Sequence, residues 1–357
     1  MNRTISAWQT GIILFVMMFA NKILLLPSLL YESAKMGALF VPIFLFLLEL
    51  FMLVLFFFLK RKYEDLSLRE ILKKCGGNFL VIAIFSLFVI YFFGKMVLIY
   101  NITYVFFKEL IYKDSTNIMF LVCFLPVIMQ LALSDFRVIG RTFQFFFPII
   151  LLVTIFVVVV GIFGIDHSSI ILHSPTKSVF ECVLKYTSAF GDSIFLFVMI
   201  DKIDIKKGQW KIFFSFAFTA IMLIVAIVSI FLFSYTYTSF MHKFALFEIV
   251  AFVKEYVGVG RIDIVSMLLV VILTYLHLAI YLKIFVESAS NIFPKLPKKS
   301  FAIFFSLLFS CVVSFIPMNL EKSIVFGEII LPYFSIFTFI IFPFLCIAFL
   351  CKKGVKT

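Results

Sequence analysis

Long apolar runs alternate with short polar segments along the whole 357-residue chain. Each run, coiled as a helix rising about 1.5 Å per residue, is long enough to cross a hydrocarbon layer roughly 30 Å thick. The breaks between runs are rich in charged and turn-forming residues, as in "KRKYEDLSLREILKK" and "NIFPKLPKKS". The pattern predicts ten membrane-spanning helices, at residues 8–31, 38–59, 78–106, 117–134, 144–165, 179–200, 212–235, 262–289, 300–317 and 328–350.

Composition supports an integral membrane protein. The chain is 64% hydrophobic and only 14% charged, with a mean hydropathy of +1.19, which leaves too few polar residues to cover a soluble fold. Its net charge of +12 indicates no nucleic-acid partner, because the basic residues concentrate in short loops between apolar runs. They favour the side that carries the N-terminus, so both termini are predicted to be cytoplasmic. On the opposite side, residues 244–258 have apolar positions near helical spacing and predict a helix lying on the outer surface.

The number of spans suggests an internal repeat. Residues 1–357 read as a single all-α domain whose ten spans divide into halves of five, at about 1–165 and 179–350. An odd number of spans in each half makes the second half inverted relative to the first. Inverted repeats are a known transporter architecture, with the binding site at broken helices in corresponding positions. We therefore expect a 5+5 inverted repeat in which spans 1 and 6 are broken.

Span 1 contains the unusual stretch "FANKILLLPSLL". Lys22 lies close to the centre of this span, too deep for its side chain to reach the membrane surface. A lysine at such a depth is unfavourable by roughly 2.5–3.5 kcal/mol, so it requires a partner or a polar cavity. Pro27, five residues later, removes a backbone donor and is expected to loosen the helix beside Lys22.

Span 6 has a polar centre, "TSAFGDS". Gly191 weakens a helix by about 1 kcal/mol relative to alanine, and Asp192 follows it near the middle of the span. Each half therefore opens with a helix that has a charge and a weak point at its centre. We predict that Lys22 and Asp192 pair across the site.

Two further charges lie near mid-depth, Glu49 in span 2 and Lys95 in span 3. With Lys22 and Asp192 they sum to zero, as a cluster removed from water should. The four charges can simply hold helices together, since a buried ion pair is weak evidence for any other role. We favour a substrate or cation pathway, because two of the four lie at helix weak points.

Span 8 opens with "GRIDIVSMLLVVILTYLHLAIYLKIF". Arg261 and Asp263 mark its outer mouth, where they belong either to the pathway or to an ordinary solvated pair. Thr274, His277 and Tyr281 share one face of the helix. This polar stripe can line a pathway in which His277 carries protons, or His277 can be a packing residue that forms hydrogen bonds.

No enzyme motif is present: the sequence lacks H-E-x-x-H, a P-loop and G-x-S-x-G. The six cysteines contain no C-x-x-C pair, and four histidines are too few for a metal cluster. We expect neither a metal site nor a cofactor, and we do not expect an enzyme.

Taken together, these stretches resemble the spore germination permeases, the B-type membrane subunits of nutrient germinant receptors. The likeness rests on span 1 with "LLLPSLLYESAKMGA", on "SAFGDSIFLFVMIDKI" in span 6 and on "GRIDIVSMLLVVI" opening span 8. Gly191–Asp192 matches the Gly-Glu pair typical of the family, and Arg261 with Asp263 matches its Arg-x-Asp/Glu motif. Asn21–Lys22 departs from the small residue usual in span 1. The resemblance implies membership of the amino acid–polyamine–organocation (APC) superfamily.

The resemblance also implies a function. A nutrient, with an amino acid expected, would bind the permease-like subunit in the inner spore membrane, beside a larger A-type membrane subunit and a C-type lipoprotein. Asp192 would take an amino group, and Lys22 or a helix N-terminus would take a carboxylate. A stand-alone proton- or sodium-coupled amino acid or cation transporter is the alternative, and an assembly protein is a third. The expected ligand-contacting residues are Asn21, Lys22, Ile23, Ser188, Ala189, Phe190, Gly191, Asp192, Thr274 and His277.

Overall fold

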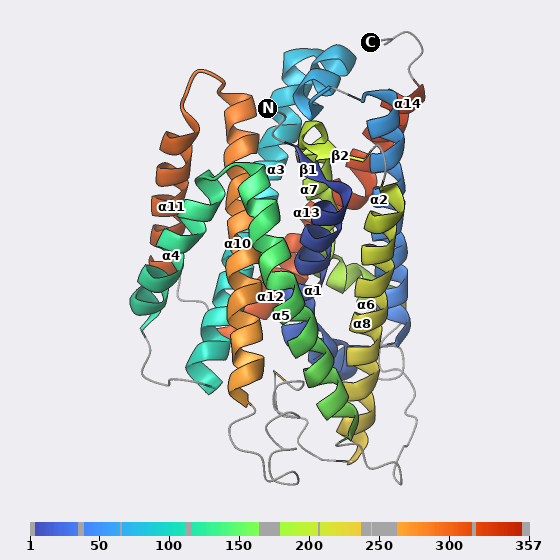
Figure 1. Cartoon of the computed structure of the whole chain (residues 1–357), viewed down its shortest axis with the longest axis vertical. Helices are drawn as coiled ribbons and strands as arrows, with labels where there is room; N and C mark the ends of the chain where they lie inside the picture. Colours follow the sequence, from blue (N-terminus) through green and yellow to red (C-terminus); the bar gives the residue numbers. More distant parts are fainter. Residues whose placement is uncertain are drawn as a thin grey trace.

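The computed structural model describes residues 4–34, 39–64, 66–110, 116–163, 179–205, 208–236, 244, 263–315 and 319–351. Helices make up nearly all of this part of the chain (Figure 1). The first half contains β1 (Ile5–Ser6), α1 (Ala7–Ala34), α2 (Phe40–Lys62), α3 (Leu68–Leu110), α4 (Asn117–Leu133) and α5 (Phe136–Phe163). The second half contains α6 (Val179–Tyr186), η3 (Thr187–Ala189), η4 (Asp192–Ile194), α7 (Phe195–Val198), η5 (Ile200–Lys202), β2 (Ile203–Asp204), α8 (Gln209–Thr236), α10 (Asp263–Ile292), α11 (Lys298–Phe315), α12 (Leu320–Val325), η6 (Phe326–Ile330), α13 (Leu331–Ile336), η7 (Phe337–Ile341) and α14 (Phe342–Cys351).

Seven helical segments of the described chain are long and apolar enough to cross a membrane, and α1 raises the number to eight if its two bent parts form one span. The two other predicted spans fall on the 17-residue α4 and on the interrupted series from α6 to α7. The predicted all-helical membrane fold is confirmed, whereas the count of ten and the 5+5 repeat stay predictions.

Two predicted spans begin later than their helices: span 10, expected from residue 328, where α12 already begins at Leu320, and span 5. α5 begins at Phe136, eight residues before the expected start of span 5 at residue 144. The amides of Val138 and Ile139 both bond the carbonyl of Asp135, so the charged "FRVIGR" stretch forms the first turns of the helix. Charge separates apolar runs in the sequence, but it does not end a helix that continues beyond the hydrocarbon layer.

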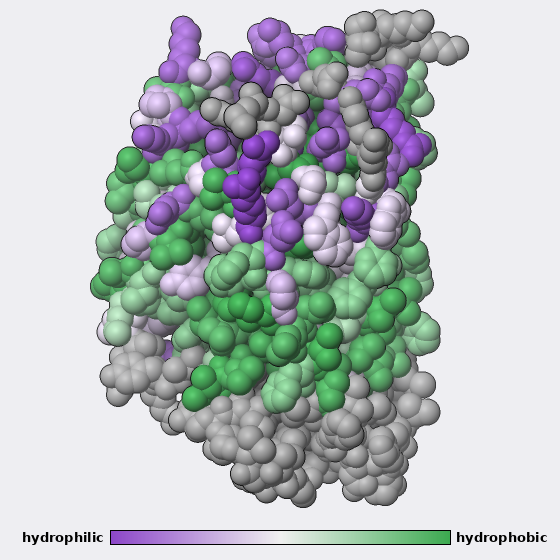
Figure 2. Space-filling view, in the orientation of Figure 1, coloured by the Kyte–Doolittle hydropathy of each residue, from purple (hydrophilic) through white to green (hydrophobic). Residues whose placement is uncertain are grey.

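α10 lies at the centre of the bundle. In its most apolar stretch 83% of α10 is buried inside the protein. The same share is 28% for α11, which lies beside α4 at the edge of the molecule (Figure 1). Apolar side chains cover much of the outer surface, and hydrophilic ones gather toward the end where β1 and β2 lie (Figure 2). Phe79 and Phe315, each 83% exposed, are among the phenylalanines on this outer surface. The polar groups inside α10 are therefore enclosed by protein.

The first span bends at its centre. α1 changes direction by 43° between the segments Ala7–Ala20 and Lys22–Leu30. The bend coincides with Asn21 and precedes Pro27, the residue expected to loosen the helix, by six positions. Lys22 is therefore the first residue after the bend, where its side chain points to the interior of the bundle and is 1% exposed.

The predicted break in span 6 is present. Its helical turns stop at Ala189, and Phe190 is extended, with φ −108° and ψ −171°. Gly191 follows in the left-handed region at φ 87°, which a residue with a side chain rarely adopts. Asp192 then begins a new series of turns. Gly191 thus allows the helical turns to stop and restart in the middle of the membrane.

The ends of spans 1 and 6 are joined. Ile5 pairs with Ile203 and Ser6 with Asp204 in a two-stranded parallel sheet, β1 with β2. The C-terminal end of α14 lies toward the same end of the molecule (Figure 1). There Lys62, at the end of α2, donates to the carbonyls of Phe349 and Leu350, at 2.9 and 2.8 Å. Span 1, which is bent but continuous and not broken as expected, and span 6, which is interrupted, are therefore linked at this end.

The last apolar segment is irregular. Two π-helical turns, η6 and η7, interrupt the α-helical geometry between Leu320 and Cys351. Turns of this kind are uncommon and occur frequently at functional sites. Glu328 lies in η6, where it faces α6.

Two expectations lie outside the described residues. The surface helix at 244–258 falls there apart from Phe244, which is buried with its ring 5.1 Å from that of Phe106. Arg261 falls there as well, as does the side chain of Asp263, whose backbone begins α10.

We expect Gly191→Ala to lower the thermal unfolding midpoint of the purified protein more than Gly77→Ala does. Both glycines have positive φ, 87° and 74°, so alanine at either position adds about 1–3 kcal/mol of backbone strain. A Cβ at position 191 would also overlap the buried Tyr91 hydroxyl, whereas nothing lies within 4 Å of one at position 77. Equal midpoints for the two variants would show that the break is not tightly enclosed.

Candidate functional site

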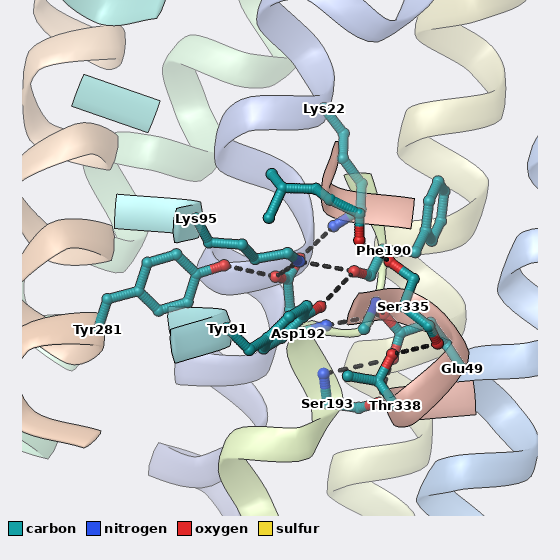
Figure 3. Close-up of polar contacts among 12 residues, drawn as sticks. Lys22, Glu49, Tyr91, Lys95, Phe190, Asp192, Ser193, Tyr281, Ser335 and Thr338 are labelled. Atoms are coloured by element: carbon teal, nitrogen blue, oxygen red, sulfur yellow. Dashed lines mark hydrogen bonds and ion pairs between the residues drawn. The ribbon is translucent and has the colours of Figure 1, made fainter. Parts of the chain in front are cut away.

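Three charged side chains from three elements meet inside the bundle (Figure 3). Lys22 of α1 lies with its Nζ 2.5 Å from Oδ2 of Asp192, and Lys95 of α3 lies 2.6 Å from Oδ1. Their side chains are 1%, 4% and 2% exposed. The predicted pairing of Lys22 with Asp192 is present, and Lys95 is a second cationic partner of the same carboxylate.

A tyrosine completes the surroundings of this carboxylate. The hydroxyl of Tyr281, on α10, donates to Oδ1 of Asp192 at 2.6 Å. Asp192 therefore accepts hydrogen bonds from three side chains on α1, α3 and α10. Charge-assisted bonds of this kind are about twice as strong as bonds between neutral groups, so Asp192 links the three helices to span 6.

Glu49 of α2 has a different role from the one predicted for it. Its Oε1 accepts the amides of Gly191 and Asp192, the latter at 3.0 Å, and its Oε2 accepts the amide and the hydroxyl of Ser193. These are the amides that a helix start leaves without partners inside the helix. Glu49 is fully buried, so its carboxylate satisfies the donor side of the break from outside span 6.

The acceptor side of the break is satisfied from α3. The carbonyl of Phe190 accepts the hydroxyl of Tyr91 at 3.0 Å and the ammonium of Lys95 at 2.6 Å. The ammonium of Lys22 lies 4.8 Å from the centre of the Phe190 ring, within the range of a cation–π interaction. Span 6 can therefore stay interrupted inside an apolar bundle, because side chains replace the missing backbone hydrogen bonds.

A cavity of about 70 Å³ opens directly onto these charges. By volume it holds a small polar molecule or a few waters. It runs from Asp192 along the second half of α1, away from the β1–β2 end. Its lining consists of Lys22, Leu25, Leu26, Leu29, Lys95, Leu98, Ile99, Ile102, Tyr186, Ser188, Ala189, Asp192, Tyr281, Ser323, Ile324, Gly327 and Glu328.

The far end of the cavity is bounded by a second ion pair. Lys185 of α6 lies 2.7 Å from Glu328 of η6, with side chains 30% and 15% exposed. One turn deeper, the hydroxyl of Ser188 donates to the carbonyl of Gly327. Glu328 also borders an apolar groove on the outer surface, of about 1060 Å³, between α2, α6 and α13. The α6–η6 contact therefore separates the cavity from the lipid side.

The structure brings together only some of the residues expected to contact a ligand. Ser188 and Ala189 line the cavity with Lys22 and Asp192, whereas Ile23 packs into the core and is not part of the lining. Gly191 and Phe190 are not part of the lining; both contribute backbone groups at the break, and Phe190 also contributes its ring, beside Lys22. The side chain of Asn21 lies outside the described part of the chain.

The three residues of the polar stripe of span 8, Thr274, His277 and Tyr281, lie in different environments. The hydroxyl of Thr274 lies 3.1 Å from that of Thr103, away from the cavity lining. His277 is 1% exposed, and neither ring nitrogen has a hydrogen-bond partner among the described residues. Its ring instead packs edge-on against that of Tyr281, at 4.5 Å between centroids. Of this stripe, Tyr281 is the residue that reaches Asp192.

Tyr91 and Glu328 belong to the site, although the sequence patterns do not single them out. Tyr91 precedes Lys95 by four positions on α3 and therefore shares its face of the helix, a signal available once Lys95 is recognised. Glu328 offers no comparable signal, because it lies at a predicted span end, where charges are ordinary.

Comparison with known proteins agrees with this architecture. Residues 4–323 match the sequence profile of the family described as spore germination protein. Among individual curated protein sequences, none matches the chain. The structure is similar to that of Mhp1, a nucleobase-cation-symport-1 family transporter in a closed conformation with bromovinylhydantoin bound. The TM-score is 0.62 at 14% identity, over 94% of this chain and 75% of Mhp1.

A second similar structure is the substrate-bound outward-open state of a Na⁺-coupled sialic acid symporter. Here the TM-score is 0.64 at 11% identity, over 94% of this chain and 79% of the symporter. At such low identity both likenesses concern the fold alone, and they confirm the expected transporter fold.

We expect Asp192→Asn to destabilise the protein more than Lys22→Met. The first change leaves two buried ammonium groups facing a neutral amide, and breaking a buried ion pair typically costs about 3–5 kcal/mol. The second leaves Asp192 with Lys95 and Tyr281. Combining both changes should partly restore stability, because one of the two unpaired ammonium groups is then absent.

Thermal unfolding in lipid nanodiscs measures these differences. Asp201→Asn is the control, since Asp201 also pairs with a lysine, Lys202, but at 23% exposure; surface pairs contribute little. Identical unfolding midpoints for Asp192→Asn, Lys22→Met and the double variant would contradict the coupling.

Proposed function

This chain belongs to the spore germination protein family, and from that premise we propose that it is the permease-like subunit of a spore germination receptor that senses a small nutrient. One observation carries the proposal: a cavity in the middle of the bundle ends on the Lys22–Asp192–Lys95 cluster at the break of span 6. In membrane proteins, ionisable residues at this depth mark substrate or ion pathways. A ligand at this position would contact α1, α3, span 6 and α10 together.

In this proposal the protein senses its ligand because the ligand competes with Asp192 for the ammonium groups of Lys22 and Lys95. A bound ligand that accepts hydrogen bonds from Lys22 or Lys95 weakens their bonds to Asp192. Lys95 also bonds the carbonyl of Phe190, so its displacement alters the contacts that hold the break. The same stretch of span 6 reaches the C-terminal helix through Ser188 and Gly327. Ligand binding would in this way be coupled to the relation between span 6 and η6.

The remaining parts of the proposal concern partners and location. The subunit would work with a larger A-type membrane subunit and a C-type lipoprotein in the inner spore membrane. Both termini would lie on the cytoplasmic side, in agreement with the distribution of basic residues. The cavity then extends from the cluster toward the outside, the side from which a nutrient arrives.

A second candidate is a stand-alone transporter coupled to protons or sodium. The observation that favours it is the shared fold with two transporters, one of them described as Na⁺-coupled. Both candidates need the same interrupted helices and the same cavity. They differ in whether the ligand crosses the membrane.

Deletion of the gene in its native host distinguishes the two. We expect spores without it to lose the nutrient-triggered fall in optical density for one nutrient of a panel of amino acids and sugars. Uptake of that nutrient by growing cells should be unchanged. Reintroducing the wild-type gene should restore the response, as a control for effects on neighbouring genes. Normal germination combined with impaired uptake would contradict a sensor and establish a transporter.

A further inference from the structure

The cavity presents more hydrogen-bond donors than acceptors. The ammonium groups of Lys22 and Lys95 carry six N–H bonds, and the hydrogen bonds among the described residues use three of them. Asp192 can accept about four hydrogen bonds and already accepts three. The hydroxyl of Ser188 donates to a backbone carbonyl, so its oxygen stays available only as a neutral acceptor. A ligand at this end therefore meets more spare charged donors than spare charged acceptors.

The charged groups at the inner end of the cavity also favour a ligand that carries a negative charge. The inner end of the cavity is lined by two lysines and one aspartate, which leaves one positive charge in excess. Glu49 supplies the charge that balances the cluster, but it lies on the other side of the break, is not part of the cavity lining, and is engaged by backbone amides. Glu328, at the far end, is paired with Lys185. A ligand at the inner end therefore directly faces two ammonium groups and one carboxylate, an arrangement that favours an anionic group.

The rest of the cavity wall favours a ligand whose remaining part is apolar. Between the two charged ends the lining consists mainly of leucine and isoleucine side chains from α1, α3 and α12. Ligand pockets commonly combine such a wall with a few polar groups that fix orientation. The arrangement fits a short aliphatic chain that carries one acidic group.

We infer that the ligand of this site is a small aliphatic carboxylate, held through its carboxylate by Lys22 and Lys95, and that an α-amino group adds little to binding. The inference rests on the proposed function, because it names the ligand class of the same cavity. It replaces the expectation that Asp192 receives the amino group of an amino acid. In this arrangement Asp192 orients the two lysines, and the ligand accepts their remaining N–H bonds.

Two matched sets of small molecules test the inference on the full-length protein in lipid nanodiscs. One set is L-alanine, propionate and ethylamine, and the other is L-valine, isovalerate and isobutylamine. Within each set the alkyl group has the same shape, and only the charged groups attached to it differ. A ligand at free concentration L that binds only the folded state stabilises it by RT ln(1 + L/Kd) and raises the thermal unfolding midpoint accordingly, so midpoints over a concentration series give each dissociation constant.

In at least one set we expect the amino acid and the carboxylate to bind within about threefold of each other. The amine should bind at least tenfold more weakly, a difference of about 1.4 kcal/mol. Lys95→Met should abolish the response to the carboxylate. Lys283→Met is the matched control, because Lys283 is another buried lysine on a spanning helix but lies outside the cavity lining. This control variant should respond like the wild type.

Binding of the amine alone, or of the amino acid without the carboxylate, would overturn the ligand class while leaving a nutrient site in place. A wild-type protein that responds to no member of either set would overturn it as well. The germination phenotype of the deletion strain decides the proposed function separately. The comparison among wild-type titrations needs no variant, so it stands even if Lys95→Met fails to fold.

Discussion

The structure depends on one constraint: backbone amides buried in a membrane must be hydrogen-bonded. Span 6 interrupts its own helix at Phe190 and Gly191, which leaves amides and a carbonyl without partners inside the helix. The carboxylate of Glu49 accepts the amides, and the side chains of Tyr91 and Lys95 satisfy the carbonyl. Without these side chains from α2 and α3, the segment would gain stability by closing into a regular helix, and the central cavity would lose its polar end.

A single carboxylate then connects this break to the rest of the bundle. Asp192 begins the chain after the break and accepts bonds from α1, α3 and α10. Removing charges from water is unfavourable, and an apolar replacement of the cluster would be no less stable in principle. Stability alone therefore does not explain the cluster, which is in keeping with the ligand site proposed beside it. The bonds that would respond to a ligand are also those that hold the broken helix.

Much of this arrangement follows from the sequence, because charges far from the membrane surface must find one another. Lys22 and Asp192 are of opposite sign, lie at mid-depth and occur at helix weak points, and these facts predict their contact. Charge alone places Glu49 in the same cluster, but its actual partners are backbone amides, which appear only once the path of span 6 is known. The side chain of α10 that reaches Asp192 is that of Tyr281 and not that of His277, one turn earlier. The rotation of the helix and the length of the side chain decide this, and the sequence pattern shows neither. Ends of spans are equally hard to predict, as α5 shows, since a helix can continue beyond the apolar run.

Hydrogen–deuterium exchange of residues 187–194 tests the central claim most directly, by comparing the wild type with Glu49→Gln in nanodiscs. If the Glu49 carboxylate holds the amides of Gly191, Asp192 and Ser193, peptides covering them should exchange faster in the variant. Peptides from α11, which lies at the edge of the bundle, should be unchanged. Equal protection of residues 187–194 in both proteins would mean that the break in span 6 does not depend on the Glu49 carboxylate, which would contradict the central claim.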